Sequence, residues 1–269
     1  MAEIWDAYDR TLNRLDHIHL IRGEQIPNNM YHLVCEIIVQ HRDGSYLLMQ
    51  RDHRKHLGGM WELTAGGSAL AGETPLACAL RELREETGIV TDGLTELCRI
   101  VHDEHHSIYV EFLCITDQDK SNVSLQAGET IAFQWVDRES LLSMEKDQLA
   151  SSRALTIIQD TDIIGKKVHV IVDRPAGSYH PRNHDIFYSI NYGYIEDIIA
   201  GDGSGQDVYI MGQDNPLETF DGIVIAVYHR TNDVEDKWIV AKEGSDFSDE
   251  EIMQKIHFVE QFFEGYLCR

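Results

Sequence analysis

Apolar residues recur along the chain in short runs, and this pattern predicts a protein rich in β-strands. Residues 31–40 form an apolar, β-branched run, and the turn at 42–45 leads into a second run at 46–52. This arrangement is typical of a hairpin. Residues 138–159 have apolar positions at helical spacing instead, so we expect one helix there. Similar apolar runs predict further strands at 95–102, 107–116 and 130–137.

The strand pattern starts again near residue 166 and continues at a spacing of roughly ten residues. Such spacing favours a small β-barrel. Residues 248–267 then have the pattern of an amphipathic helix, with Ser248 as N-cap and Glu251 in the capping-box position. We therefore predict two domains, residues 1–160 and 166–269. The strand candidates of the second domain are 166–175, 186–195, 207–212, 221–230 and 236–241.

Composition narrows the classes of partner. The net charge of −23 disfavours binding to nucleic-acid polymers and to anionic membranes, whereas phosphates remain accessible through bridging metal ions. The sequence has no apolar run of membrane-spanning length, and residues 1–10 lack the pattern of a signal peptide. The five cysteines form no CxxC motif, which favours reduced thiols. We expect a cytoplasmic protein.

The segment 67–89 carries the strongest chemical signal. Thr74 followed by Pro75 is a helix start, and Gly88 suits a left-handed helix end, so we expect a helix over 75–87. The three acids Glu82, Glu85 and Glu86 then share one helix face. A solvated acidic face is the ordinary interpretation of such a run. The alternative is a site for Mg²⁺ or Mn²⁺, whose preferred ligands are carboxylate oxygens.

The spacing of these residues resembles the signature of the Nudix hydrolases. That signature is a glycine, five residues, a glutamate, seven residues, and then Arg-Glu-hydrophobic-x-Glu-Glu-x-Gly-hydrophobic. The resemblance covers residues 1–150 and implies an α/β/α sandwich. Its start is similar to the branch near isopentenyl-diphosphate isomerases, but the strand before the signature ends in LTAGG, without the cysteine that such an isomerase requires. The matching residues are Gly67, Glu73, Arg81, Glu82, Leu83, Glu85, Glu86, Gly88 and Ile89.

The resemblance implies cleavage of a diphosphate bond in a nucleoside diphosphate derivative or nucleoside triphosphate. It assigns metal binding to Glu82, Glu85, Glu86 and the backbone of Gly67, and catalytic roles to Glu82, Glu85, Arg81 and Glu129. The expected partner is a small phosphorylated substrate. The alternative function is a non-catalytic sensor of a nucleotide or phosphate. The histidine-rich stretch 102–106 is interpreted as a polar turn, with a substrate contact as the second option.

The second half contains, in this order, the stretches VIVDRPAGSYHP, YSINYGYI, GDGSGQDVYIMG and HRTNDVEDKWIVA. Their order and spacing resemble those of soluble inorganic pyrophosphatases, which implies an OB-like β-barrel followed by a C-terminal helix. Three residues depart from that family's pattern: Ser204 replaces an acid, Tyr179 stands near the place of a lysine, and Arg182 only approximates an expected arginine. The interpretation therefore leaves open pyrophosphate hydrolysis, phosphate binding, homodimerisation and structural support. The residues that match the family are Asp173, Tyr194, Asp202, Asp207, Asp233, Asp236 and Lys237.

Overall fold

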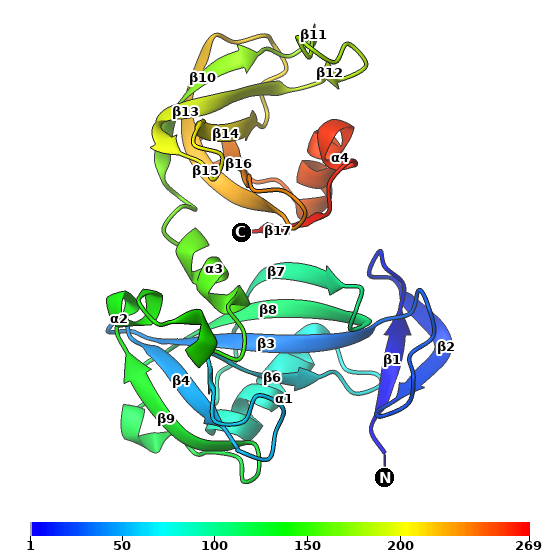
Figure 1. Cartoon of the computed structure of the whole chain (residues 1–269), viewed down its shortest axis with the longest axis vertical. Coiled ribbons are helices and arrows are strands. Elements are labelled where there is room, and N and C mark those ends of the chain that lie inside the picture. Colours follow the sequence, from blue (N-terminus) through cyan, green and yellow to red (C-terminus); the bar gives the residue numbers. More distant parts are fainter. Residues whose placement is uncertain (1) are drawn as a thin grey trace. The chain divides into compact units, whose positions relative to one another are not determined.

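The computed structural model describes residues 2–269, which divide into two compact units, Met1–Ile157 and Ile158–Arg269 (Figure 1). The first unit is a mixed α/β structure built on a twisted sheet. None of the helices within the described residues is long and apolar enough to cross a membrane.

In the first unit, the central strand is β3 (His32–His41), which pairs in parallel with β8 (Ser107–Thr116) and antiparallel with β6 (Thr64–Ser68). A separate hairpin, β1 (Ile4–Tyr8) and β2 (Arg14–Ile21), was not expected from the sequence. The remaining strands of the sheet are β7 (Thr95–His102), β4 (Tyr46–Arg51), β5 (Trp61–Glu62) and β9 (Thr130–Val136).

Helix α1 (Pro75–Thr87) has the predicted bounds. The Thr74 side chain accepts a hydrogen bond from the backbone N–H of Ala77, and Gly88 ends the helix with φ 73°. The helix packs against β6 and β3 because the buried face that carries Ala79 and Leu83 joins the core of the sheet. This packing fixes the adjoining, acidic face of α1 beside the strand β6, where the backbone N–H of Gly66 donates to Glu86.

The single helix predicted over 138–159 is wrong. The structure has three short helices there instead, separated by serine-containing turns. The Asp137 side chain caps the first helix, and the backbone carbonyl of Ser152 accepts bonds from the first turn of the last. Ser and Asp side chains compete with the helix for backbone hydrogen bonds, which explains the interruptions. The three helices are α2 (Arg138–Leu142), η2 (Lys146–Gln148) and α3 (Arg153–Asp160).

The strands of the second unit close into a ring. Each strand pairs with the next in the order β10–β13–β14–β16–β15, and β15 pairs back to β10. The pair β14–β16 is parallel and the other pairs are antiparallel. The ring strands are β10 (Lys167–Arg174), β13 (Asn191–Ile199), β14 (Gly205–Ile210), β15 (Thr219–Arg230) and β16 (Lys237–Ala241).

Outside the ring, this unit has a hairpin of β11 (Ser178–Tyr179) with β12 (Phe187–Tyr188), and helix α4 (Asp249–Glu260). The predicted capping box at Ser248 and Glu251 is confirmed. The predicted helix end is wrong, because residues 265–268 form strand β17 (Gly265–Cys268) against β15. A Cβ atom at Gly265 would lie 2.3 Å from the carbonyl oxygen of His229, so glycine permits this close pairing.

Candidate functional site

The acidic face of α1 is organised by the guanidinium of Arg81. Its Nε and Nη2 donate to the two carboxylate oxygens of Glu73, at 2.8 and 2.9 Å. Its Nη1 donates to Glu82 at 2.6 Å and to Glu85 at 3.3 Å. Arg81 therefore fixes three carboxylates in one place, and Glu73 supports the arginine at the start of the helix.

Burial sets the charge state of two of these acids. Burial raises the pKa of Glu82 even though Arg81 opposes the shift. Burial also raises the pKa of Glu86 to about 7, although the backbone N–H of Gly66 donates to its carboxylate at 3.1 Å. Buried carboxylates at this density need a positive partner to stay ionised.

The backbone of Gly67 lies directly against this cluster. A Cβ atom at this position would lie 2.5 Å from Oε1 of Glu82, so any side chain would collide with the carboxylate. The main chain of Gly67 therefore lies against the Glu82 carboxylate, and the three carboxylates and the Gly67 carbonyl group all offer oxygen donors. Such an all-oxygen donor set fits Mg²⁺ or Mn²⁺. Gly67, Glu82, Glu85 and Glu86 are the residues that could hold the ion.

Glu129 is not on α1 and lies outside the Arg81 network. Its carboxylate forms an ion pair with Lys55, and its side chain is 38% exposed. The charges of Glu129 and Lys55 both act on the pKa of Glu86, so the pair lies near the acidic face. The structure therefore brings Glu129 into the neighbourhood of the cluster, with its carboxylate held by a cation.

A pocket of about 360 Å³ opens in the first unit, and sequence reasoning missed its central residues. Arg153 donates to Glu111 at 2.6 Å and to Glu36 at 2.7 Å, and its guanidinium lies 3.9 Å from the ring centroid of Tyr109. Glu111 is fully buried, and burial raises its pKa. The only sequence signal was an acid within the apolar run at 107–116.

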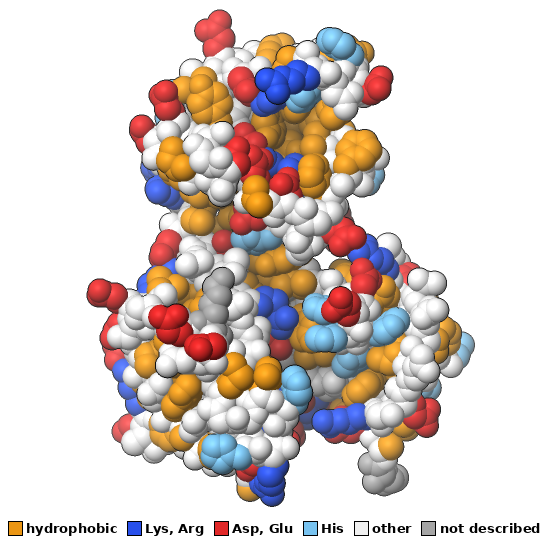
Figure 2. All heavy atoms as spheres, in the orientation of Figure 1, with side chains coloured by type: hydrophobic (Ala, Val, Ile, Leu, Met, Phe, Trp, Pro, Cys, Tyr) orange, Lys and Arg blue, Asp and Glu red, His pale blue; other side chains and the backbone are white. Residues whose placement is uncertain are grey.

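The histidine-rich stretch forms a turn between β7 and β8, as the sequence suggested. His102 and His105 stack with ring centroids 4.2 Å apart, and both line this pocket. Figure 2 shows histidine side chains gathered on this part of the first unit. Within the described residues, the stretch belongs to no group of three donors close enough to share a metal ion.

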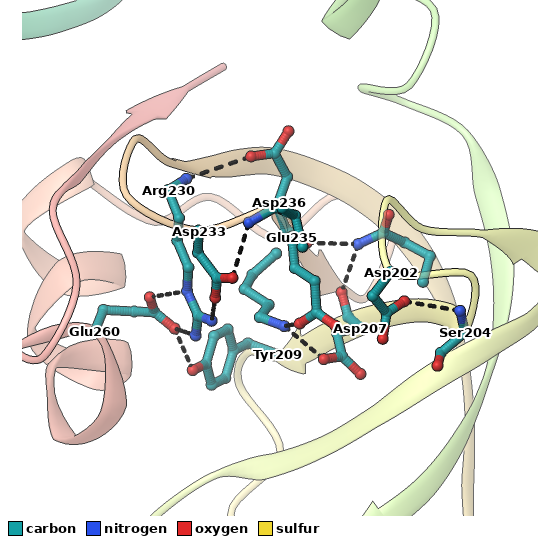
Figure 3. Close-up of polar contacts among 12 residues, drawn as sticks. Asp202, Ser204, Asp207, Tyr209, Arg230, Asp233, Glu235, Asp236 and Glu260 are labelled. Carbon is teal, nitrogen blue, oxygen red and sulfur yellow. Dashed lines mark hydrogen bonds and ion pairs between the residues drawn. The ribbon is translucent and has the colours of Figure 1, made fainter.

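A second pocket, of about 640 Å³, lies in the second unit. The structure brings Asp173, Tyr194, Asp202 and Asp207 together in its lining. Figure 3 shows Ser204 beside Asp202 and Asp207. The backbone N–H of Ser204 donates to Asp202 at 2.7 Å and lowers the pKa of that acid. Arg174, His180, Arg182 and Glu235 complete the polar lining.

Lys237 is 2% exposed and lies behind the acids of the second pocket. Its ammonium donates to Asp207 at 2.5 Å and to Glu235. Glu235 was not among the site residues expected from the sequence. The available signal was its spacing of two residues from Lys237, which places two side chains on the same face of a strand. The ammonium offsets part of the negative charge of the pocket.

Two of the expected acids do not line this pocket. Asp233 accepts from Arg230 at 2.9 Å, and Arg230 also binds Glu260 (Figure 3). Asp236 contacts Nδ1 of His229 at 2.8 Å. Tyr179 also lies outside the lining: it is 60% exposed and packs against another aromatic ring on β12.

The chain matches the NUDIX domain family over residues 30–157. It is 30% identical over 142 residues to an uncharacterised Nudix hydrolase of Listeria innocua, covering 52% of this chain and 82% of that protein. It is 34% identical over 88 residues to an 8-oxo-dGTP diphosphatase of Proteus vulgaris, covering 32% of this chain and 76% of that protein. The structure of a MutT protein from Methanosarcina mazei aligns with a TM-score of 0.40 at 26% identity, over 49% of this chain and 93% of that one. The chain belongs to the Nudix hydrolase family.

Proposed function

We propose that the protein hydrolyses a phosphoanhydride bond in a nucleoside diphosphate derivative or a nucleoside triphosphate, with Mg²⁺ or Mn²⁺ as cofactor. The observation that carries the proposal is the carboxylate cluster on α1, where Arg81 fixes Glu73, Glu82 and Glu85. The 8-oxo-dGTP diphosphatase among the relatives supports a nucleotide substrate.

Each residue of the cluster has a separate task in this proposal. Glu82, Glu85, Glu86 and the Gly67 backbone would hold the cation, which neutralises phosphate charge and lowers the pKa of a bound water. Arg81 orients the carboxylates through paired hydrogen bonds. Glu85 has the most exposed side chain of those bound to Arg81, at 41%, so it can accept a proton from the attacking water. Glu129 is the second candidate base, once Lys55 releases it.

The pocket around Arg153 supports binding of the rest of the substrate. Glu36 lines this pocket. In the antiparallel pairing of β3 with β6, Glu36 lies opposite Gly66, next to the pair of Cys35 with Gly67. The pocket is therefore adjacent to the carboxylate cluster, and Tyr109 and the paired histidines offer aromatic surfaces to a planar group. The strand before α1 ends in LTAGG, without a cysteine. This favours hydrolysis over isomerisation, because the isomerisation needs a cysteine at that position.

For the second unit we propose an OB-like, pyrophosphatase-like barrel that binds a phosphate-containing ligand. Its closed ring of strands and the grouping of Asp173, Asp202 and Asp207 support this proposal. Ser204 supplies no charged oxygen, and the ammonium of Lys237 already binds Asp207. Both features weaken cation binding, so we propose ligand binding with little or no turnover of inorganic pyrophosphate.

The proposed hydrolysis is tested by Glu85→Gln in the intact protein. We expect turnover of nucleotide substrates with Mg²⁺ to fall on the order of 100-fold or more, because the amide neither holds the cation nor accepts the proton. Glu139→Gln, an exposed glutamate of α2, is the matched control and should retain full turnover. Unchanged turnover in Glu85→Gln would contradict the assignment of the cluster.

A further inference from the structure

The second unit contains a buried cluster of three different donor types. Asp160, His229 and Cys268 are 4%, 6% and 1% exposed, and their carboxylate, imidazole and thiol donor atoms all lie within 4.8 Å of one another. Asp160 is the last residue of α3, His229 lies in β15 and Cys268 lies in β17. Three segments that are distant in the sequence therefore converge on one point.

The imidazole of His229 is fixed from both sides. Its Nε2 lies 2.7 Å from Oδ2 of Asp160, and its Nδ1 lies 2.8 Å from Oδ2 of Asp236. A carboxylate on the second ring nitrogen is the arrangement that orients metal-binding histidines and raises their basicity. The ring of Tyr266 lies 5.1 Å from the imidazole, between centroids, and helps to cover it.

We propose that Asp160, His229 and Cys268 form a buried zinc site with three protein ligands, with Asp236 as the acid that orients the histidine. Zn²⁺ takes thiolate, imidazole and carboxylate ligands, whereas Mg²⁺ prefers oxygen alone. A thiolate and a carboxylate together balance the charge of the ion. Typical Zn²⁺ bond lengths place ligand atoms about 3.3 Å apart, so Asp160 and His229 need to separate by less than about 1 Å.

This site is separate from the carboxylate cluster on α1 and has a different role. The zinc ion would join the segment that leads into the barrel to β15 and β17. It would also fix Asp236, whose neighbour Glu235 lines the second pocket and forms an ion pair with Lys237. The expected effect of the ion is thus on the stability of this unit and on the shape of its pocket.

The test uses the intact, reduced and metal-free protein titrated with Co²⁺ in excess Mg²⁺. A cobalt ion bound by a thiolate gives a charge-transfer absorption in the near ultraviolet, whereas a cobalt ion held by carboxylates gives none. We expect this absorption to saturate at about one equivalent and to disappear when Zn²⁺ is added. Its absence in the wild-type protein would overturn the proposal.

Variants identify the ligands. Cys268→Ser should abolish the absorption, and Asp236→Asn should keep it while raising the Co²⁺ dissociation constant on the order of 10- to 100-fold. Cys78→Ser is the matched control, because Cys78 is also buried and lies next to the other candidate metal site, with its Sγ 3.6 Å from the Gly67 carbonyl oxygen. Persistence of the absorption in Cys268→Ser, or its loss in Cys78→Ser, would contradict the assignment.

A measurement on the wild-type protein covers the case in which Cys268→Ser does not fold. Alkylation of the thiols in mild denaturant is followed by mass spectrometry, with and without Zn²⁺. We expect Zn²⁺ to slow alkylation of Cys268 at least tenfold more than that of Cys78. Equal protection of the two thiols would overturn the proposal.

Discussion

Arg81 and Glu73 form a bidentate ion pair, in which Nε and Nη2 of Arg81 lie 2.8 and 2.9 Å from the two carboxylate oxygens of Glu73. The same guanidinium reaches Glu82 at 2.6 Å, so Glu73 positions the arginine that in turn positions a candidate metal ligand. This geometry requires the planar fork of arginine, which lysine cannot reproduce. The pair therefore connects the signature glutamate outside the helix to the acids on it.

Replacing Arg81 with lysine should weaken metal binding more than folding. We expect Arg81→Lys to lower Mg²⁺-dependent turnover on the order of 10- to 100-fold, because a single ammonium cannot hold Glu73 and Glu82 together. Arg99→Lys is the control, since Arg99 forms the same kind of pair with Glu96 on β7. Equal losses in the two variants would contradict a positioning role for Arg81.

Adding one methyl group at Gly67 should disturb the carboxylate cluster directly. The new Cβ would lie 2.5 Å from Oε1 of Glu82, so Gly67→Ala must displace that carboxylate from its place in the cluster. We expect a higher Mg²⁺ requirement for turnover, measured by titration of the ion. Gly93→Ala meets no atom within 4 Å and should behave as the wild type. An unchanged Mg²⁺ titration in Gly67→Ala would exclude this contact from the site.

His32 should make the first unit sensitive to acid. Burial lowers the pKa of His32 to about 4 from an ordinary value of 6.5, and its ring stacks on Trp5 at 4.3 Å. The unfolded chain therefore binds a proton that the folded protein excludes. The contribution of neutral His32 to the free energy of unfolding is fully present above pH 6.5. It falls by about 3 kcal/mol in total as the pH drops toward 4.

The test of His32 is urea unfolding between pH 7 and pH 4. His32→Gln should have a shallower loss of stability over this range than the wild type. His184→Gln, at an exposed position of the second unit, should leave the pH dependence unchanged. The same slope in His32→Gln and the wild type would show that another group controls the acid sensitivity.

Lys237 should stabilise the second unit by neutralising two acids. Lys237→Met leaves Asp207 and Glu235 without their cation, and we expect a loss of about 2–3 kcal/mol in thermal or chemical unfolding. Adding Glu235→Gln to this variant should recover part of the loss, because one uncompensated charge is removed. Lys242→Met, at an exposed position, is the control. A double variant less stable than Lys237→Met would contradict this role.

The contiguous parts of the fold and site were predictable, and the parts assembled from distant segments were not. Thr74, Gly88 and the glutamates of α1 lie within one short stretch, so local spacing was sufficient to place them. The contacts of Arg153 with Glu36 and Glu111 join a helix to two strands, and no local pattern encodes them.

The second half illustrates the same limit. Asp236 and Glu235 are adjacent in the sequence, yet one contacts His229 and the other lines the pocket, because neighbouring residues of an extended segment point in opposite directions. Likewise, the apolar residues near Leu267 continue the helical pattern, but Gly265 permits a strand against β15, and tertiary pairing decides the outcome.

The central claim is that the carboxylate cluster of α1 catalyses hydrolysis of a phosphoanhydride bond. The most direct measurement incubates the intact protein with Mg²⁺ and a panel of nucleoside triphosphates, dinucleotides and nucleotide sugars in ¹⁸O-labelled water. We predict at least one substrate whose products carry one ¹⁸O on a phosphate, and no such product with Glu85→Gln or without the divalent cation. Saturable nucleotide binding with no labelled product across the panel would contradict the claim and favour a sensor.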